Sequence, residues 1–313
     1  MTITKHPTSR RGTLMLIGGA EDKFEQKFIL KTFFEQSGRR RARLSVLPSA
    51  SENQDSGAIY QQIFTDWGAR SVRVISLFNR EEADLPEVAK ELATSTGIFL
   101  TGGDQSKIVN ILHGTASLRA IVAAYEKGAT IAGTSAGAAA LSDPMIAGGK
   151  SGSLPRSGMV KLAQGLGLTR SLLIDQHFHQ RNRLGRLLTA VMSFPQMLGV
   201  GVDEDTAALV TPDDQLTVIG RGTVTIVDTS HLQSVNLATT PDRSPLAFSN
   251  LVLHTMVHGG RFDLNTRAVM IKESGYENFG DASLSRTQRA RLKSRDSAGA
   301  RHRGFGRAAL QHD

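Results

Sequence analysis

The 313-residue sequence predicts an α/β fold: a mostly parallel, doubly wound three-layer sandwich with antiparallel strands at one edge. Short apolar runs that end in glycine or proline alternate with longer segments of helical apolar spacing over residues 13–281. Such alternation favours right-handed crossovers and a parallel sheet covered by helices on both faces. Between Gly199 and Asp228 the pattern changes to short strands separated by polar turns, which predicts the antiparallel edge.

The predicted elements follow one another in a regular order along the chain. Strands are expected at residues 13–19, 43–48, 71–77, 97–103 and 172–178, and helices at residues 21–37, 59–67, 86–94, 105–127 and 181–193. The glycine- and serine-rich segment 148–158 is expected to be a mobile loop that borders a site. No repeat and no clear linker precede residue 280, so residues 1–281 are predicted to form one domain.

Composition excludes several classes of protein. The chain contains no cysteine, which excludes disulfides, thiolate metal sites and a cysteine nucleophile. No apolar run approaches the ~18 residues that a membrane span needs, and the polar N-terminus lacks the apolar core of a signal peptide, which predicts a cytoplasmic protein with no membrane partner. Most of the net charge of +8 lies in residues 282–313, which contain eight Lys or Arg residues and two acidic residues. This segment reads as a disordered basic tail, and no nucleic-acid partner is predicted.

The segment from Gly133 to Gly137 has the form of a nucleophile elbow. An apolar run beginning at Ala129 enters Gly-Thr-Ser-Ala-Gly, and small helix-favouring residues follow. Flanking glycines permit a tight strand-to-helix turn that exposes the oxygen of Ser135, and the positive end of the helix points at the place where an oxyanion would form. Small residues at such a turn also occur for packing alone.

A serine nucleophile needs a base, and the base needs an acid that fixes its tautomer. The ends of predicted strands supply these groups in the order Ser135, His177, Glu204, which differs from the order of the α/β-hydrolases. His179 is the other candidate base, because it would share a side with His177 on a continuing strand. Glu204 is distinguished from its two acidic neighbours only by alternation, and the three acids could equally be solvated caps.

Two further groups have a functional and a structural interpretation. The N–H groups of Gly103 and Ala136 would form a two-donor oxyanion hole, although the glycine pair at 102–103 fits a tight turn equally well. Three arginines follow the histidine strand at positions 181, 183 and 186. They could bind a substrate carboxylate or form ion pairs with Asp175 or Asp203.

Four motifs in consistent order resemble the cyanophycinases, serine peptidases related to aspartyl dipeptidase (peptidase E). The motifs are Ile-Gly-Gly-Ala-Glu-Asp-Lys from residue 17, Leu-Thr-Gly-Gly-Asp-Gln from residue 100, the elbow, and the segment from Ile174 through Arg-Asn-Arg-x-Gly-Arg-Leu. The resemblance covers about residues 12–275 and implies a flavodoxin-like sheet similar to that of class I glutamine amidotransferases. It implies Ser135 as nucleophile, His177 as base and Glu204 as acid. It places Gln105, Asp175, Gln176, Arg181, Arg183 and Arg186 at the substrate pocket.

The resemblance implies hydrolysis of cyanophycin, a polyaspartate that carries arginine on each β-carboxyl, to β-Asp-Arg dipeptides by way of an acyl-enzyme. The enzyme is expected to need no metal and no organic cofactor, and to form a homodimer. Two alternatives remain open from the sequence. One is an aspartyl or isoaspartyl dipeptidase that acts on small peptides, and the other is an amidotransferase-like binding protein whose serine is inert.

Overall fold

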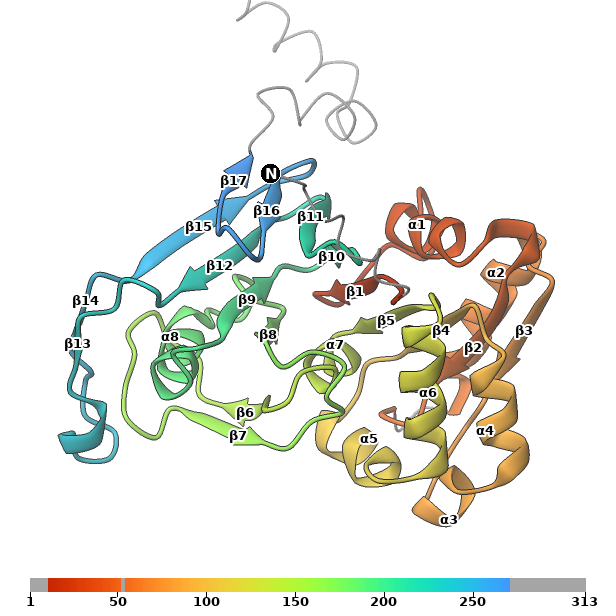
Figure 1. Ribbon diagram of the computed structural model, residues 1–313, viewed down its shortest axis with the longest axis horizontal. Coiled ribbons are helices and arrows are strands. Elements are labelled where there is room, and N and C mark those ends of the chain that lie inside the picture. Colours follow the sequence, from red (N-terminus) through yellow and green to blue (C-terminus); the bar gives the residue numbers. More distant parts are fainter. Residues whose placement is uncertain (1–10, 52–53, 271–313) are drawn as a thin grey trace, which may run out of the picture. The chain divides into compact units, whose positions relative to one another are not determined.

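Two sheets dominate the computed structural model, which describes residues 11–51 and 54–270 (Figure 1). In the described residues, the main sheet has nine strands in the order β17-β16-β11-β10-β1-β5-β4-β2-β3, and a second sheet has the order β15-β12-β9-β8. All described residues fall in one compact unit, Met1–Lys272. The predicted boundary at 281/282 and the basic tail lie outside the described residues.

The main sheet is parallel on one side and antiparallel on the other. Its parallel strands are β1 (Leu14–Ile17), β5 (Thr130–Thr134), β4 (Gly97–Leu100), β2 (Arg43–Leu47) and β3 (Ser71–Val74). The antiparallel strands are β10 (Thr206–Val210), β11 (Gln215–Gly220), β16 (Arg261–Asp263) and β17 (Val269–Met270). The mixed α/β architecture predicted from the sequence is confirmed.

The second sheet contains β8 (Leu172–Gln176), β9 (Leu198–Val202), β12 (Val224–Asp228) and β15 (Val252–Met256). Two short ladders join β6 (Met145–Gly149) to β7 (Val160–Ala163), and β13 (Ser234–Val235) to β14 (Phe248–Ser249). The α-helices are α1 (Phe28–Gln36), α2 (Ala58–Asp66), α3 (Arg80–Ala83), α4 (Pro86–Ala93), α5 (Gln105–Leu112), α6 (Ala116–Glu126), α7 (Ala136–Ala140) and α8 (Leu184–Ser193). Short 3-10 turns occur at Arg39–Arg41, Gln54–Gly57 and Leu237–Thr239.

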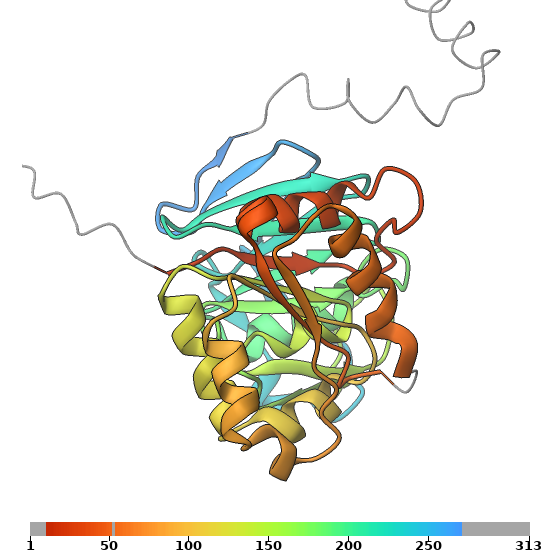
Figure 2. The same ribbon diagram turned by 90° about the vertical axis from the view of Figure 1, so that its right-hand side faces the viewer.

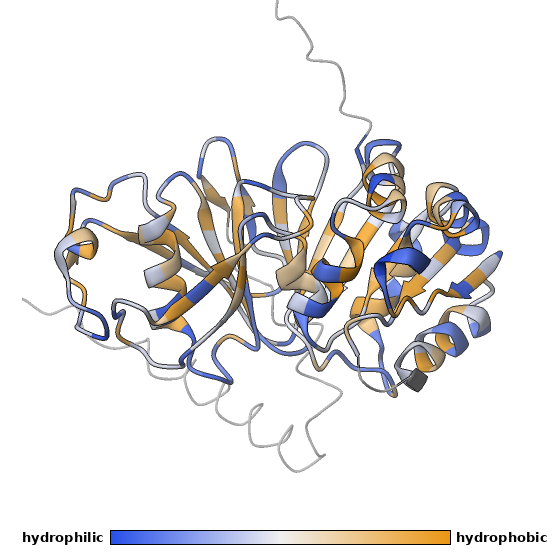
Figure 3. Ribbon diagram, turned by 90° about the horizontal axis from the view of Figure 1, so that it is seen from below, coloured by the Kyte–Doolittle hydropathy of each residue, from blue (hydrophilic) through white to orange (hydrophobic). Residues whose placement is uncertain are grey.

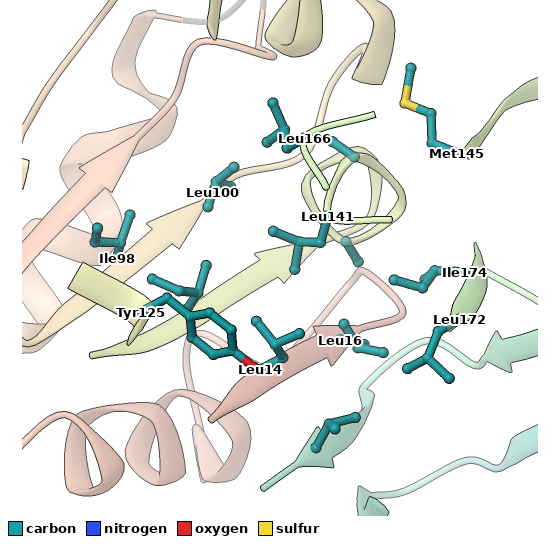
Figure 4. Packing of buried hydrophobic residues seen from close by; sticks show 14 of the residues in the cluster. Leu14, Leu16, Ile98, Leu100, Tyr125, Leu141, Met145, Leu166, Leu172 and Ile174 are labelled. Carbon is teal, nitrogen blue, oxygen red and sulfur yellow. The ribbon is translucent and has the colours of Figure 1, made fainter. Parts of the chain in front are cut away.

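Alternating side chains of the parallel strands fill two cores. On β1, Leu14 and Leu16 join the cluster beneath α4, α5 and α6, whereas Met15 and Ile17 join the cluster beneath α1 and α2. Figure 2 shows these helices on opposite faces of the sheet, and Figure 4 shows the first cluster from nearby. The apolar strands lie between helices whose outer turns are hydrophilic (Figure 3). Burial of each such aliphatic side chain stabilises the fold by about 1.5–3 kcal/mol.

In the part of the chain that the structure describes, no single helix is both long and apolar enough to cross a membrane. The pair α5 and α6 meets that criterion only jointly, by length and composition, and is bent by 98°.

The sequence did not predict that the late strands divide between two sheets. β10 extends the main sheet antiparallel to β1, and β11 pairs antiparallel with β10, as expected for edge strands. In contrast, β9 and β12 belong to the second sheet, where β9 pairs in parallel with β8. The helix α8 lies between β8 and β9 in the chain, so these three elements form a crossover unit whose two strands pair in parallel.

Two predicted helices begin later than the sequence pattern indicated. The helix expected from residue 21 starts at Phe28, because the Asp22 carboxylate accepts hydrogen bonds from four consecutive backbone N–H groups of residues 24–27 and fixes a non-helical turn. The helix expected from Arg181 starts at Leu184, with Arg183 at its N-cap position. The two arginines therefore lie in the turn that follows β8.

Candidate active site

Ser135 occupies a strained turn between β5 and α7. Its φ of 53° and ψ of −117° lie outside the regions that side-chain-bearing residues normally adopt. Flanking glycines are required by space, since a Cβ on Gly133 would lie 2.4 Å from the carbonyl carbon of Gly137. A Cβ on Gly137 would lie 2.4 Å from the carbonyl oxygen of Leu100. The strand, strained serine and helix form the geometry of a nucleophile elbow.

The structure brings Ser135, His177 and Glu204 into a hydrogen-bonded row. The Oγ of Ser135 lies 2.8 Å from Nε2 of His177, and Nδ1 of the same ring lies 2.6 Å from Oε1 of Glu204. A carboxylate only accepts, so Nδ1 carries a proton and Nε2 of the neutral ring is free to accept the serine proton. Their roles in catalysis remain a prediction, but the row has the order that a serine nucleophile, its base and its orienting acid require.

The end of β1 holds the histidine in place. The backbone N–H of His177 donates to the carbonyl oxygen of Gly18 at 2.8 Å. Gly19 lies directly against the imidazole, where an added Cβ would approach Cε1 of His177 to 2.4 Å. The glycine pair that ends β1 therefore leaves the space that the ring occupies.

The alternative histidine and the two alternative acids have other partners. Nδ1 of His179 lies 2.9 Å from Oδ1 of Asp203, and Oδ2 of the same carboxylate accepts from the hydroxyl and N–H of Thr223. Asp205 accepts from the backbone N–H of Asp22 at 3.0 Å. The sequence left open a choice between two histidines and among three acids. In the structure, His177 and Glu204 are the ones that form the row with Ser135.

Burial lowers the pKa of His177 below its ordinary value, and the positive charges of Arg181 and Arg183 act in the same direction. The hydrogen bond and the charge of Glu204 raise the pKa, but they only partly offset the loss of hydration. The ring is therefore neutral at neutral pH, which is the form that a general base needs.

The two predicted oxyanion donors flank the serine. Ala136 is the first residue of α7, and Gly103 follows β4 with a φ of +142° that glycine tolerates. Among the described residues, neither backbone N–H donates a hydrogen bond to another protein group. A Cβ on the adjacent Gly102 would lie 3.3 Å from Cβ of Ser135, so this loop runs past the nucleophile. Asp104 caps α5 by accepting from the N–H of Ser106 at 2.8 Å.

Asp175, Arg183 and Arg186 form a buried charged cluster. Nε of Arg186 donates to Oδ2 of Asp175 at 2.6 Å, and its Nη2 contacts Oδ1. Nη1 of Arg183 lies 3.4 Å from the same Oδ1, and burial lowers the pKa of Arg183 to about 10 although Asp175 raises it. Asp175 and Arg186 are only 1% and 4% exposed, so their charged atoms contact each other rather than solvent. For Arg183 and Arg186, the structure shows the ion-pair alternative, with Asp175 rather than Asp203.

Of the other predicted pocket residues, Gln105 has a structural contact, Gln176 is buried next to the serine and Arg181 is exposed. Nε2 of Gln105 donates to the carbonyl oxygens of Ile146 (3.1 Å) and Ala147 (2.8 Å), so it fixes β6. Oε1 of Gln176 accepts from Oγ of Ser135 at 3.3 Å. Arg181 is exposed beside the histidine, and its N–H donates to the carbonyl oxygen of His177 at 3.0 Å.

Sequence reasoning missed Glu21, a buried carboxylate behind the nucleophile. It is 3% exposed and accepts from the hydroxyls of Tyr60 at 2.5 Å and Thr134 at 2.6 Å, while Nζ of Lys23 lies 3.1 Å away. Thr134 directly precedes Ser135, so this contact fixes the strand end that carries the nucleophile. The glycine-rich turn that precedes Glu21 was visible in the sequence, but nothing there indicated that this carboxylate is buried.

Comparisons with known proteins indicate the family of the chain. The model of Peptidase family S51 matches residues 14–219. A cyanophycinase of Trichormus variabilis is 42% identical over 266 residues, which cover 84% of this chain and 89% of that protein. A cyanophycinase of Synechococcus elongatus is 42% identical over 271 residues, which cover 86% and 84%.

A solved structure shows the same fold. The crystal structure of a peptidase from an acI-B1 Actinobacterium aligns with a TM-score of 0.59 at 19% identity, over 81% of this chain and 97% of that one. The family model covers most of the chain and the curated relatives cover more of it, so both comparisons identify the same group. The chain therefore belongs to peptidase family S51 and is a serine peptidase.

Proposed function

We propose that this peptidase is a cyanophycinase, a serine-type exopeptidase that hydrolyses cyanophycin to β-Asp-Arg dipeptides through an acyl-enzyme. The observation that carries the proposal is the row Ser135–His177–Glu204, with distances of 2.8 Å and 2.6 Å, on a strained elbow. The substrate is inferred from the names of the relatives that are 42% identical to this chain.

In the acylation step, Oγ of Ser135 attacks the scissile carbonyl carbon while Nε2 of His177 takes the hydroxyl proton. The carbonyl oxygen becomes an oxyanion, and the free N–H groups of Gly103 and Ala136 stabilise it; each such donor typically contributes about 3 kcal/mol. Glu204 keeps the proton on Nδ1 and stabilises the imidazolium as it forms. Collapse of the oxyanion breaks the C–N bond, and His177 gives its Nε2 proton to the leaving amine.

In the deacylation step, water replaces the amine. His177 takes a proton from the water as its oxygen attacks the ester carbonyl, and the second oxyanion forms at the same two N–H groups. Its collapse breaks the bond to Ser135, and His177 returns the proton to the serine oxygen. The cycle balances protons through one imidazole and requires no other co-reactant than water.

Direct substrate contacts are proposed for two of the six predicted pocket residues, and a supporting role for the other four. Gln176 and Arg181 are suited to touch the substrate directly, because one reaches Ser135 and the other is exposed beside the catalytic histidine. The cluster of Asp175, Arg183 and Arg186, together with Gln105 on the other side, is suited to order the turns that form the pocket. The guanidinium of Arg181 suits a substrate carboxylate, which it can bind with two parallel hydrogen bonds.

The test is incubation of purified protein with cyanophycin granules and analysis of the soluble products by mass spectrometry, with Ser135→Ala as the matched control. Release of β-Asp-Arg by wild type alone supports substrate, reaction and nucleophile together. If only short aspartyl peptides are cleaved, the substrate assignment is wrong and the dipeptidase alternative holds. If nothing is cleaved and a serine-directed inhibitor fails to label Ser135, the protein is an inert binder.

We further propose that the enzyme is a cytoplasmic homodimer. The absence of cysteine from the sequence fits a reducing compartment, and the family resemblance implies the dimer. Light scattering coupled to size-exclusion chromatography tests the dimer directly; a mass of one chain, 33.7 kDa, would contradict it.

A further inference from the structure

A basic cavity of about 380 Å³ lies at the loop between β6 and β7. The residues that carry its chemistry are three cations and three hydroxyls, and no Asp or Glu belongs to its lining; they are Lys150, Arg156, Arg243, Ser151, Ser153 and Ser157. The sequence singled out this loop as the border of a site, and the reaction described above does not use it.

Backbone pairing holds two of the cations close to each other. The N–H of Ser157 donates to the carbonyl oxygen of Ser244 at 3.0 Å, and the N–H of Arg243 donates to the carbonyl oxygen of Ser157 at 3.0 Å. Nη1 of Arg156 donates to the carbonyl oxygen of Arg243 at 3.2 Å. The cavity wall therefore brings like charges close together on exposed side chains, and an anion bound between them would reduce their repulsion.

Protein carboxylates provide little compensation. Within the described chain, no carboxylate oxygen lies within 4.0 Å of Lys150 or Arg156. Nε of Arg243 lies 3.6 Å from Oδ2 of Asp242, but these side chains are 79% and 71% exposed, so the pair is weak. The cavity therefore retains a net positive charge suited to an anionic ligand.

The loop that lines the cavity is hydrogen-bonded to the turn that follows the catalytic histidine. The N–H of Gly152 donates to the carbonyl oxygen of Asn182 at 2.7 Å, and the N–H of Gly185 donates to the carbonyl oxygen of Gly152 at 2.8 Å. Asn182 lies five residues after His177 in the sequence. The loop that lines the cavity is thus a direct neighbour of the turn that follows His177.

We propose that this cavity is a polymer subsite, which binds carboxylates on cyanophycin repeats beyond the one being hydrolysed. This inference rests on the proposed function. Each arginine of the polymer is attached through its amino group, so its own carboxylate is free, and an extended polyaspartate presents such groups at every repeat. The three cations and the serine hydroxyls bind the carboxylate, and the exposed Leu154, at 64%, contacts the aliphatic part of the arginine.

The test compares hydrolysis of the polymer with hydrolysis of a substrate of two repeats. The variant Lys150→Gln/Arg156→Gln/Arg243→Gln removes three cavity charges. The matched control Arg73→Gln/Lys90→Gln/Lys127→Gln removes the same total charge from exposed positions on β3, on α4 and at the end of α6. In the cavity variant, the ratio of kcat/KM for polymer to that for the two-repeat substrate should fall about 3- to 150-fold, the range for three exposed charge pairs.

Three outcomes distinguish the possibilities. A fall in the ratio for the cavity variant alone, through KM, with a weaker salt dependence than wild type, supports the subsite. An equal change in both triple variants overturns it, because total charge is then the cause. If wild type cleaves neither substrate, the proposed function fails and the subsite fails with it.

Discussion

Glu21→Gln tests whether the buried carboxylate behind Ser135 acts on catalysis or only on stability. The substitution keeps the size of the side chain and replaces one acceptor oxygen by an NH₂ group. The two hydroxyl donors at 2.5 Å and 2.6 Å can then no longer both find an acceptor, and Lys23 loses its partner at 3.1 Å. Glu21 acts through Thr134, so it is a positioning residue.

The magnitude follows from these contacts. A hydrogen bond to a charged acceptor contributes about 1.5–3 kcal/mol, and a neutral replacement recovers about 1 kcal/mol. We therefore expect Glu21→Gln to lower the free energy of unfolding by about 1–3 kcal/mol. Because Thr134 holds the end of β5, we also expect kcat to fall about tenfold, which equals about 1.4 kcal/mol, while KM stays within twofold.

The assay combines urea unfolding with steady-state hydrolysis, and Tyr60→Phe is the control. That control removes one hydroxyl donor to Glu21 but leaves the Thr134 contact, so it should lower stability by about 1.5–3 kcal/mol and leave kcat close to wild type. A Glu21→Gln enzyme that is destabilised but keeps the wild-type kcat would refute the positioning role.

The remaining predictions concern the catalytic row itself. Ser135→Ala should lower kcat by ~10⁴ or more while urea unfolding shows an intact fold, and near-normal turnover would contradict the nucleophile. Because the pKa of His177 is lowered, the acid limb of kcat/KM should lie below the ordinary histidine value, near 6.5, and a limb above it would contradict the burial argument. Glu204→Gln removes a contact that raises this pKa, so the limb should move to still lower pH as kcat falls, whereas a limb shifted upward would argue against the contact. Gly19→Ala should lower kcat at least tenfold because its Cβ would lie 2.4 Å from the ring, whereas Gly148→Ala, with nothing within 4 Å, should not; equal rates in both would exclude the steric role.

The sequence predicted the parts of the site that depend on where strands end. Ser135, His177 and Glu204 each lie just after an apolar strand, and the strand ends of an α/β sheet converge. The sequence left open whether the arginines pair with Asp175, with Asp203 or with a substrate carboxylate, because the choice depends on α8 beginning at Leu184 and on the turn before it. The start of α1 was mispredicted for a similar reason, since the apolar spacing extends back to Phe24 while the carboxylate of Asp22 holds that stretch in a turn.

The division between two sheets was also beyond the sequence pattern, and it matters for the site. Ser135 belongs to the main sheet, whereas His177 and Glu204 follow β8 and β9 of the second sheet. The two halves meet at the end of β1. There the N–H of His177 donates to the oxygen of Gly18 at 2.8 Å, and the N–H of Asp205 donates to the oxygen of Gly19 at 2.9 Å.

This junction explains why residues 18 and 19 are both glycine. A Cβ on Gly18 would lie 2.0 Å from the carbonyl oxygen of Asp203, and one on Gly19 would meet the ring of His177. Either side chain would separate the second sheet from β1 and move the base away from the serine. Since a displacement of about 1 Å can cost 10²-fold in rate, the spacing between the sheets sets the catalytic geometry as directly as the three reacting side chains do.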